Sequence, residues 1–125
     1  MKTKLLIVVV LFMPLLLLSS GCKKQEVLFT ACGVEKTITD IEWLSNIKTS
    51  YEDNNEISIA KIVLYEWNDD SYFYVQKTIS STNDLPNHVY NCSGEVILTC
   101  GGNQPENNCS TFFNESTKIE TIWTK

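Results

Sequence analysis

The amino-acid sequence predicts an α+β fold, in which one N-terminal helix packs on a curved antiparallel sheet of about four to five strands and disulfide bonds stabilise the domain. Three observations lead to this prediction. An apolar helical face comes early in the chain, and segments rich in β-branched and aromatic residues follow it. Four of the five cysteines of the 125-residue chain lie at residue 32 or later, where they can cross-link the predicted domain.

The first 21 residues have the features of a secretory signal peptide. Two lysines form a positive start, residues 5–18 are apolar, and small residues precede Cys22. A transmembrane helix is the competing interpretation. However, residues 5–18 are fewer than the roughly 20 that span a bilayer, and Pro14 interrupts them.

The run Leu18-Ser19-Ser20-Gly21-Cys22 resembles the lipobox of bacterial lipoproteins, although Ser19 stands where that family usually has Leu. The resemblance implies that Cys22 begins the mature protein and carries a diacylglyceryl thioether, usually with a further acyl chain such as palmitate on the new N-terminus. Two or three chains hold a protein firmly, whereas a single chain anchors only marginally. An ordinary signal cleaved near Gly21, which leaves a free thiol, is the alternative.

The mature chain is expected to comprise a lipid-anchored tether at residues 22–31 and a single α+β domain at residues 32–125. Residues 27–29 (Val-Leu-Phe) are too apolar for a pure linker. We therefore expect them to dock on the domain or to form an edge strand.

The helix is expected over residues 40–52. Thr39 and Glu42 have the spacing of a capping box, which satisfies free amides at a helix start. Apolar residues then recur at intervals of three and four, which places them on one helical face; they are Ile41, Leu44, Ile47 and Tyr51.

Strands are expected at residues 57–67, 72–79, 88–92, 95–100 and 118–124. Short connections between the first four force antiparallel pairing. Residues 57–67 are apolar on both faces, which predicts a central strand or a second covering element. Residues 101–117 are expected to form a loop with one helical turn near 109–113.

Cys32, Cys92, Cys100 and Cys109 are an even set in a short exported chain, which predicts two disulfide bonds. Three connectivities exist. We favour Cys100–Cys109 together with Cys32–Cys92, because Cys92 and Cys100 are poorly placed in their hairpin to bond each other. A zinc site is disfavoured, since no C-x₂-C pair is present and the chain has one histidine.

Charge disfavours nucleic-acid binding. Loss of the signal removes two of the 10 basic residues, which changes the formal net charge from −5 to −7. All 10 are lysines, whereas nucleic-acid recognition needs a basic patch and arginine forks. The acidic balance favours solubility, and no cofactor is expected.

No catalytic residue is assigned from the sequence. His88 is the single histidine and is expected to be a solvated residue at the start of a strand rather than a general base. The oxygen-rich run 52–56 lacks the alternating ligands and central glycine of a calcium loop, so a solvated turn is expected there and no metal site.

Aromatic residues gather on the first predicted hairpin. Core packing is the simplest explanation for them. However, one helix cannot bury both faces of the strands, and an exposed aromatic face would bind a protein or a glycan. The candidate partner-binding residues are Tyr65, Trp67, Tyr72 and Tyr74.

The mature chain contains three short motifs: Cys32-Gly33-Val34, a Tyr-x-Cys-x-Gly-Glu element at residues 90–95, and Cys100-Gly101-Gly102. Together they resemble a family of small bacterial envelope lipoproteins whose domain has no assigned function. The resemblance implies a cell-envelope protein with paired cysteines, on the periplasmic or the surface side. It implies no catalytic or binding residues.

The sequence therefore predicts a lipid-anchored cell-envelope protein that binds an unknown protein partner without catalysis. An inhibitor is one form of this hypothesis, with loop 101–108 as the inhibitory element. The alternatives are an envelope hydrolase that acts on cell-wall or glycan material, which needs a paired set of carboxylates, and a carrier of a small apolar ligand, which needs a cavity.

Overall fold

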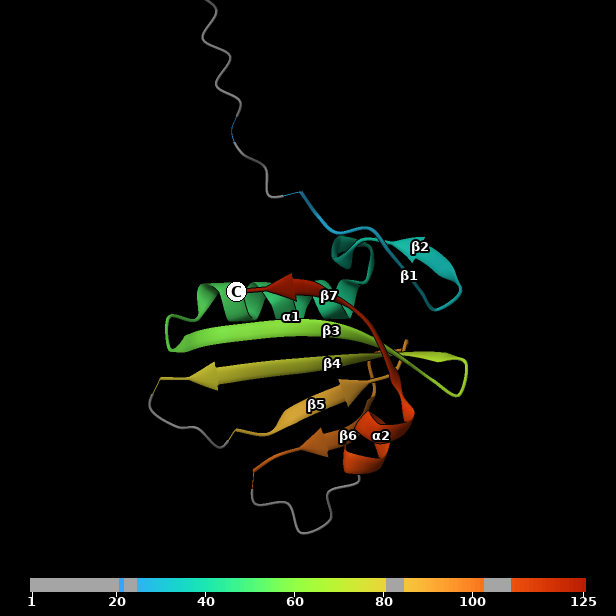
Figure 1. The fold of residues 1–125 in the computed structure, drawn as a ribbon. Helices are drawn as coiled ribbons and strands as arrows, with labels where there is room; N and C mark the ends of the chain where they lie inside the picture. The colour runs from blue at the N-terminus through green and yellow to red at the C-terminus, as the bar shows by residue number, and fades with distance from the viewer. Residues whose placement is uncertain (1–20, 22–24, 81–84, 103–108) are drawn as a thin grey trace, which may run out of the picture.

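The computed structural model describes residue 21 and residues 25–80, 85–102 and 109–125 (Figure 1). These residues form a five-stranded sheet, a two-stranded sheet and short helices. The strands are β1 (Phe29–Ala31), β2 (Val34–Lys36), β3 (Ile57–Trp67), β4 (Asp70–Ile79), β5 (Asn87–Tyr90), β6 (Val96–Cys100) and β7 (Thr117–Thr124). The helical elements are the 3₁₀ turn η1 (Ile38–Asp40), α1 (Glu42–Asp53) and α2 (Cys109–Glu115).

The α+β class that the sequence predicts is wrong. The described residues are mainly β, with two short α-helices and no long N-terminal helix packed across the sheet. The physical reason is length: the 12 residues of α1 make about 18 Å of helix, whereas the 11 residues of β3 extend over roughly 36 Å. A helix this short leaves much of the sheet to be covered by other elements.

The helical segment is also divided near its start. Ile41 has an extended backbone, with φ −110° and ψ 94°, and it separates η1 from α1. The capping interaction forms earlier than predicted, because the amide of Thr37 donates to Asp40 Oδ2 at 2.6 Å. Thr37 and Asp40 therefore take the place that the sequence suggested for Thr39 and Glu42.

The larger sheet is antiparallel throughout, with the order β6-β5-β4-β3-β7. β3 lies between β4 and β7, which confirms the predicted central position of residues 57–67. A two-residue turn, Asn68-Asp69, joins β3 to β4, and both residues have positive φ (51° and 63°). Such a turn matches the twist of a hairpin.

Both edge strands of the larger sheet pair irregularly. Register shifts interrupt the pairing of β3 with β7 at two places, after Ile62 and after Leu64. Another interrupts the pairing of β5 with β6 after Val89. Bulges twist an edge and blunt its ability to recruit a strand from another chain.

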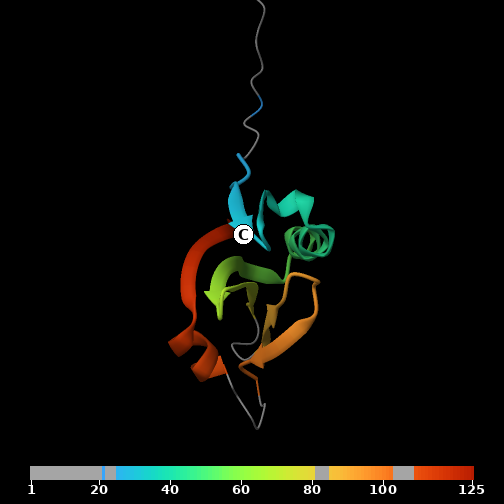
Figure 2. The ribbon, with the colours of Figure 1, turned by 90° about the vertical axis from the view of Figure 1, so that its right-hand side faces the viewer.

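The two faces of β3 enter two different cores. In Figure 2, α1 and α2 lie on opposite sides of β3. Ile62 and Leu64 pack with Leu44 of α1 and with β1. Tyr65 and Trp67 pack instead with the α2 side of the molecule. Successive side chains of a strand point to opposite faces, so α1 and α2 cover opposite faces of the sheet. This explains why residues 57–67 are apolar on both faces.

The segment predicted as a tether ends inside the fold. Phe29 and Ala31 are only 3% and 1% exposed, and β1 pairs with β2 in the register Phe29↔Lys36. Of residues 27–29, which were expected to dock on the domain or to form an edge strand, Phe29 is buried and begins β1, whereas Val27 and Leu28 are 40% and 57% exposed. The β1–β2 hairpin shares with α1 the covering of one sheet face.

Both predicted disulfide pairings are present. Cys32–Cys92 joins the β1–β2 turn to the β5–β6 turn, 60 positions apart in sequence. Cys100–Cys109 joins the end of β6 to the start of α2, nine positions apart.

Candidate functional site

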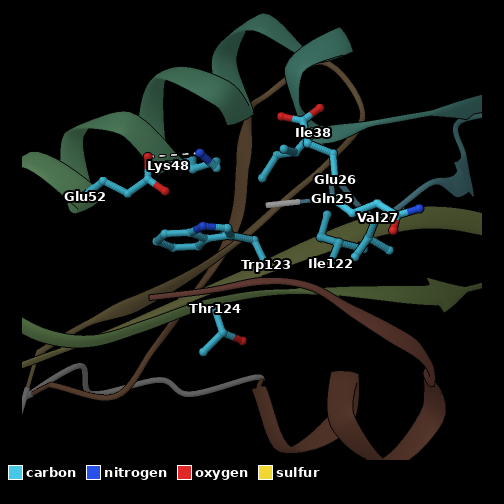
Figure 3. A pocket seen from close by; sticks show the side chains of 9 residues that line it. All are labelled: Gln25, Glu26, Val27, Ile38, Lys48, Glu52, Ile122, Trp123 and Thr124. Atoms are coloured by element: carbon cyan, nitrogen blue, oxygen red, sulfur yellow. Dashed lines mark hydrogen bonds and ion pairs between the residues drawn. The ribbon is translucent and has the colours of Figure 1, made fainter. Parts of the chain in front are cut away.

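A groove of about 330 Å³ lies between the N-terminal segment, α1 and the end of β7 (Figure 3). In Figure 3 Ile122 and Trp123 of β7 point toward α1 and the N-terminal segment. The volume is at the low end of the range of about 300–1,000 Å³ that small-molecule sites occupy. The lining residues are Gln25, Glu26, Val27, Ile38, Lys48, Glu52, Ile122, Trp123 and Thr124.

The floor of the groove is apolar. Ile38 and Ile122 are 3% and 4% exposed, and Trp123 is half-buried beside them. On the α1 side, Lys48 Nζ lies 2.9 Å from Glu52 Oε2, so these two charges compensate each other at the rim. A ligand with an apolar body fits this lining better than a fully polar one.

Side-chain contacts hold the walls of the groove. The hydroxyl of Thr39 donates to Glu26 Oε2 at 2.8 Å, which fixes the N-terminal segment against η1. Lys125 Nζ donates to the carbonyls of Tyr51 and Asn54 at 2.6 and 2.7 Å, which ties the end of β7 to the end of α1. The cation also suits the carbonyl-rich C-terminus of a helix.

The four aromatic candidates from the sequence lie together on the face that α2 covers. Phe112, which is fully buried, is at the centre of this group. Its ring centroid lies 5.4 Å from that of Tyr65, 5.5 Å from that of Trp67 and 6.1 Å from that of Tyr72. Edge-to-face and tilted ring pairs at these distances stabilise a fold by more than the burial of their apolar surface alone.

Part of the aromatic group remains at the surface. Phe113 is 37% exposed, and its ring lies 5.0 Å from Tyr74 and 5.6 Å from Tyr65. We call Tyr65, Tyr74 and Phe113 the aromatic rim. Trp67 has a different role, because its indole N–H donates to Glu115 Oε2 at 3.2 Å and so holds the end of α2.

The hydroxyls of the aromatic rim stay protonated at neutral pH. Burial raises the pKa of Tyr65. Burial also raises the pKa of Tyr74, although a hydrogen bond with Asn87 acts in the opposite direction. The rim therefore offers two neutral hydroxyls next to apolar rings, a combination that is enriched at protein interfaces.

Sequence reasoning missed Phe112 and Phe113. The available signal was a pair of adjacent phenylalanines that begins three positions after Cys109 in an otherwise polar stretch. Because the Cys100–Cys109 bond fixes the first residue of α2, it also fixes where these two rings meet the sheet.

His88 is placed on β5, where it is partly buried rather than in a solvated loop. Its Nδ1 lies 3.1 Å from the hydroxyl of Thr99, and its ring lies 6.0 Å from that of Tyr90. Burial lowers the pKa of His88, and the nearby Lys77 lowers it further. Within the described part of the chain these ring contacts are with a hydroxyl and an aromatic ring rather than a carboxylate, so they do not resemble a catalytic triad.

The oxygen-rich run after α1 forms a local turn. Asn54 Oδ1 accepts a hydrogen bond from the amide of Glu56 at 2.9 Å, and residues 52–56 are exposed. Within the part of the chain that the structure describes, no three His, Cys, Asp or Glu residues are grouped to hold a metal ion.

Residues 1–20 of the predicted signal peptide and Cys22 lie outside the described residues, as does most of loop 101–108. In the described ranges no helix is both long and apolar enough to cross a membrane.

Residues 47–125 match the model of a family described as a domain of unknown function (DUF6970). The chain belongs to this family. No curated protein and no solved structure matches it. The predicted membership of an uncharacterised domain family is therefore confirmed, while the lipobox and the envelope location stay predictions.

The DUF6970 match includes most of α1, the whole five-stranded sheet and α2. The aromatic rim and the Cys100–Cys109 bond lie inside it. Cys32 precedes the matched residues, whereas its partner Cys92 is within them. The groove crosses the boundary, because α1 and β7 belong to the DUF6970 match and residues 25–27 do not.

Proposed function

We propose that this DUF6970 protein is a lipid-anchored protein of the bacterial cell envelope that binds a protein partner without catalysing a reaction. The lipid would be carried by Cys22, which follows the Ser-Ser-Gly run typical of a lipobox. Phe29, seven positions later, is already buried in the domain. A tether this short would keep the domain close to the membrane.

The observation that carries the binding proposal is the aromatic rim. Phe113 remains 37% exposed although it packs edge-to-face with Tyr74 and Tyr65, which are themselves half-buried. Interfaces are enriched in aromatic side chains, and their hot spots are Tyr and Trp more than other residues. The rim is also rigid, since the disulfide and the buried Phe112 fix α2 to the sheet. Such rigidity lowers the entropy that binding costs.

The partner-binding set predicted from the sequence is thereby narrowed. Tyr65 and Tyr74 stay in the proposal because they contact Phe113 at the surface. Trp67 and Tyr72 are assigned to the support of α2, because the ring of α2 that they contact is the buried Phe112 rather than Phe113.

The test uses the full-length lipidated protein captured from detergent-solubilised envelopes, with Phe113→Ala as the variant. Ile59→Ala is the matched control, because Ile59 is 56% exposed on β3 away from the rim. We expect Phe113→Ala to lower recovery of a specific partner at least tenfold, as truncation of a hot spot does. Ile59→Ala should leave recovery unchanged. Equal recovery by both variants would remove the rim from the proposal.

A second candidate function, carriage of a small apolar ligand, is supported by the apolar floor of the groove. The volume of the groove suits a narrow ligand.

A further inference from the structure

The groove lies next to the proposed anchor. Gln25 is one of its lining residues and stands three positions after Cys22. An extended chain spans at most about 3.3–3.6 Å per residue. The Cα atom of Cys22 must therefore lie within roughly 11 Å of the Cα atom of Gln25, whatever path the connection takes.

The groove offers an apolar surface that no part of the described chain covers. Val27, on its N-terminal wall, is 40% exposed, and Trp123 forms part of the floor. At the rim, Lys48 forms an ion pair with Glu52, and the carboxylate of Glu26 accepts a hydrogen bond from Thr39. A hydrocarbon chain entering the groove would thus meet Ile38, Ile122 and Trp123 at the floor, with these polar groups at the rim.

We propose that the groove holds one acyl chain of the lipid on Cys22 when the protein is outside a bilayer. This inference rests on the proposed function, because it requires a lipidated Cys22. Inside a bilayer the methylene groups of the chain are already withdrawn from water, so the hydrophobic effect does not favour their transfer into the groove. In water, every methylene that enters the groove is removed from an unfavourable environment. The groove therefore acts as a shelter for one chain while the protein crosses an aqueous compartment.

Photo-crosslinking tests the occupant directly. Cells that express the full-length protein are supplied with a fatty acid that carries a diazirine near its methyl end. The lipidated protein is purified, transferred to amphipol, irradiated and digested with trypsin. Cleavage after Lys118 and Lys125 releases residues 119–125, which include Ile122, Trp123 and Thr124 of the groove. We expect cross-links between the acyl chain and this peptide within one copy of the protein.

Two valine variants provide the comparison. Val27→Gln adds a polar group to the N-terminal wall of the groove, whereas Val34→Gln makes the same change on β2, outside the lining; both valines are exposed. We expect Val27→Gln to reduce the cross-link to residues 119–125 at least fivefold and Val34→Gln to leave it unchanged. Thermal unfolding of each variant checks that the fold is intact.

Several outcomes would overturn the proposal. They are equal cross-linking in the wild type and Val27→Gln, cross-links confined to amphipol, and cross-links that join two copies. Intact-mass measurement separates these from a failure of the proposed function. If Cys22 carries no acyl group, the anchor itself is refuted, and with it the shelter. If Cys22 is acylated and the groove peptide is unlabelled, the shelter alone is refuted.

Discussion

The indole ring of Trp43 in α1 lies directly against Gly94 in the turn between β5 and β6. A Cβ atom on Gly94 would come within 2.7 Å of Trp43 Cγ. The indole N–H also donates to the carbonyl of Cys92 at 3.4 Å, and the ring lies 5.2 Å from that of Tyr90. The contact joins two segments that are about 50 positions apart, beside the point where the Cys32–Cys92 bond also joins distant segments.

Gly94→Ala is expected to destabilise the protein through this contact. Gly94 has φ +83°, which strains any residue with a Cβ, and the new methyl group would also displace the Trp43 ring. We expect a loss of about 2–4 kcal/mol in the free energy of unfolding, measured by urea denaturation of the oxidised protein. Gly33→Ala is the matched control, because Gly33 has φ +78° with nothing within 4 Å of the added atom. It should cost about 1–2 kcal/mol, and equal losses in both variants would show that the ring contact is unimportant.

The two disulfide bonds are expected to differ in their access to reductant. Cys92 is exposed, whereas Cys100 and Cys109 are 5% and 4% exposed. Thiol exchange requires approach to a sulfur atom, so Cys32–Cys92 should open first under native conditions. Mild reduction followed by alkylation and peptide mass spectrometry should label Cys32 and Cys92 before the other pair. Simultaneous labelling of all four would indicate that reduction occurs only after global unfolding.

The antiparallel strands and the cysteine pairing could be predicted because local signals decide them. The Asn68-Asp69 turn fixes the β3–β4 hairpin, and the β5–β6 hairpin geometry keeps Cys92 away from Cys100. The fold class could not be predicted from the same signals. The apolar spacing at residues 41–51 indicates a helix, but it does not reveal that Ile41 is extended or that Phe29 and Ala31 share the covering of that sheet face.

The candidate sites depend still more on tertiary contacts. The sequence identified Tyr65 and Tyr74 as candidates, but α2, which decides how much of each is exposed, appeared only as one helical turn in a loop. The groove could not be predicted at all. It combines residues 25–27, Lys48 and residues 122–124, and no periodicity links segments so far apart along the chain.

His88 is expected to make stability depend on pH. Its pKa is lowered in the folded protein by burial and by Lys77, relative to about 6.5 in the unfolded chain. The unfolded state therefore binds the proton more readily, so stability is fully present above about pH 6.5 and falls as the pH drops through the folded-state pKa. When the pH is lowered from 7.5 to 5.5, the urea concentration at the unfolding midpoint should fall more for the wild type than for His88→Gln. An identical decrease in both proteins would show that other groups cause the effect.

Phe112 and Phe113 are neighbours in α2, and their truncation should separate stability from binding. Phe112 is fully buried among Tyr65, Trp67 and Tyr72, so Phe112→Ala leaves a cavity and is expected to cost about 3–5 kcal/mol. Phe113→Ala removes a ring that is 37% exposed and should cost about 1 kcal/mol or less by urea denaturation. If Phe113→Ala nevertheless abolishes partner capture, the loss cannot be attributed to unfolding, and the aromatic rim is the binding surface. If Phe113→Ala lowers the free energy of unfolding as much as Phe112→Ala does, Phe113 is part of the core. The binding proposal would then lose the exposed ring that supports it.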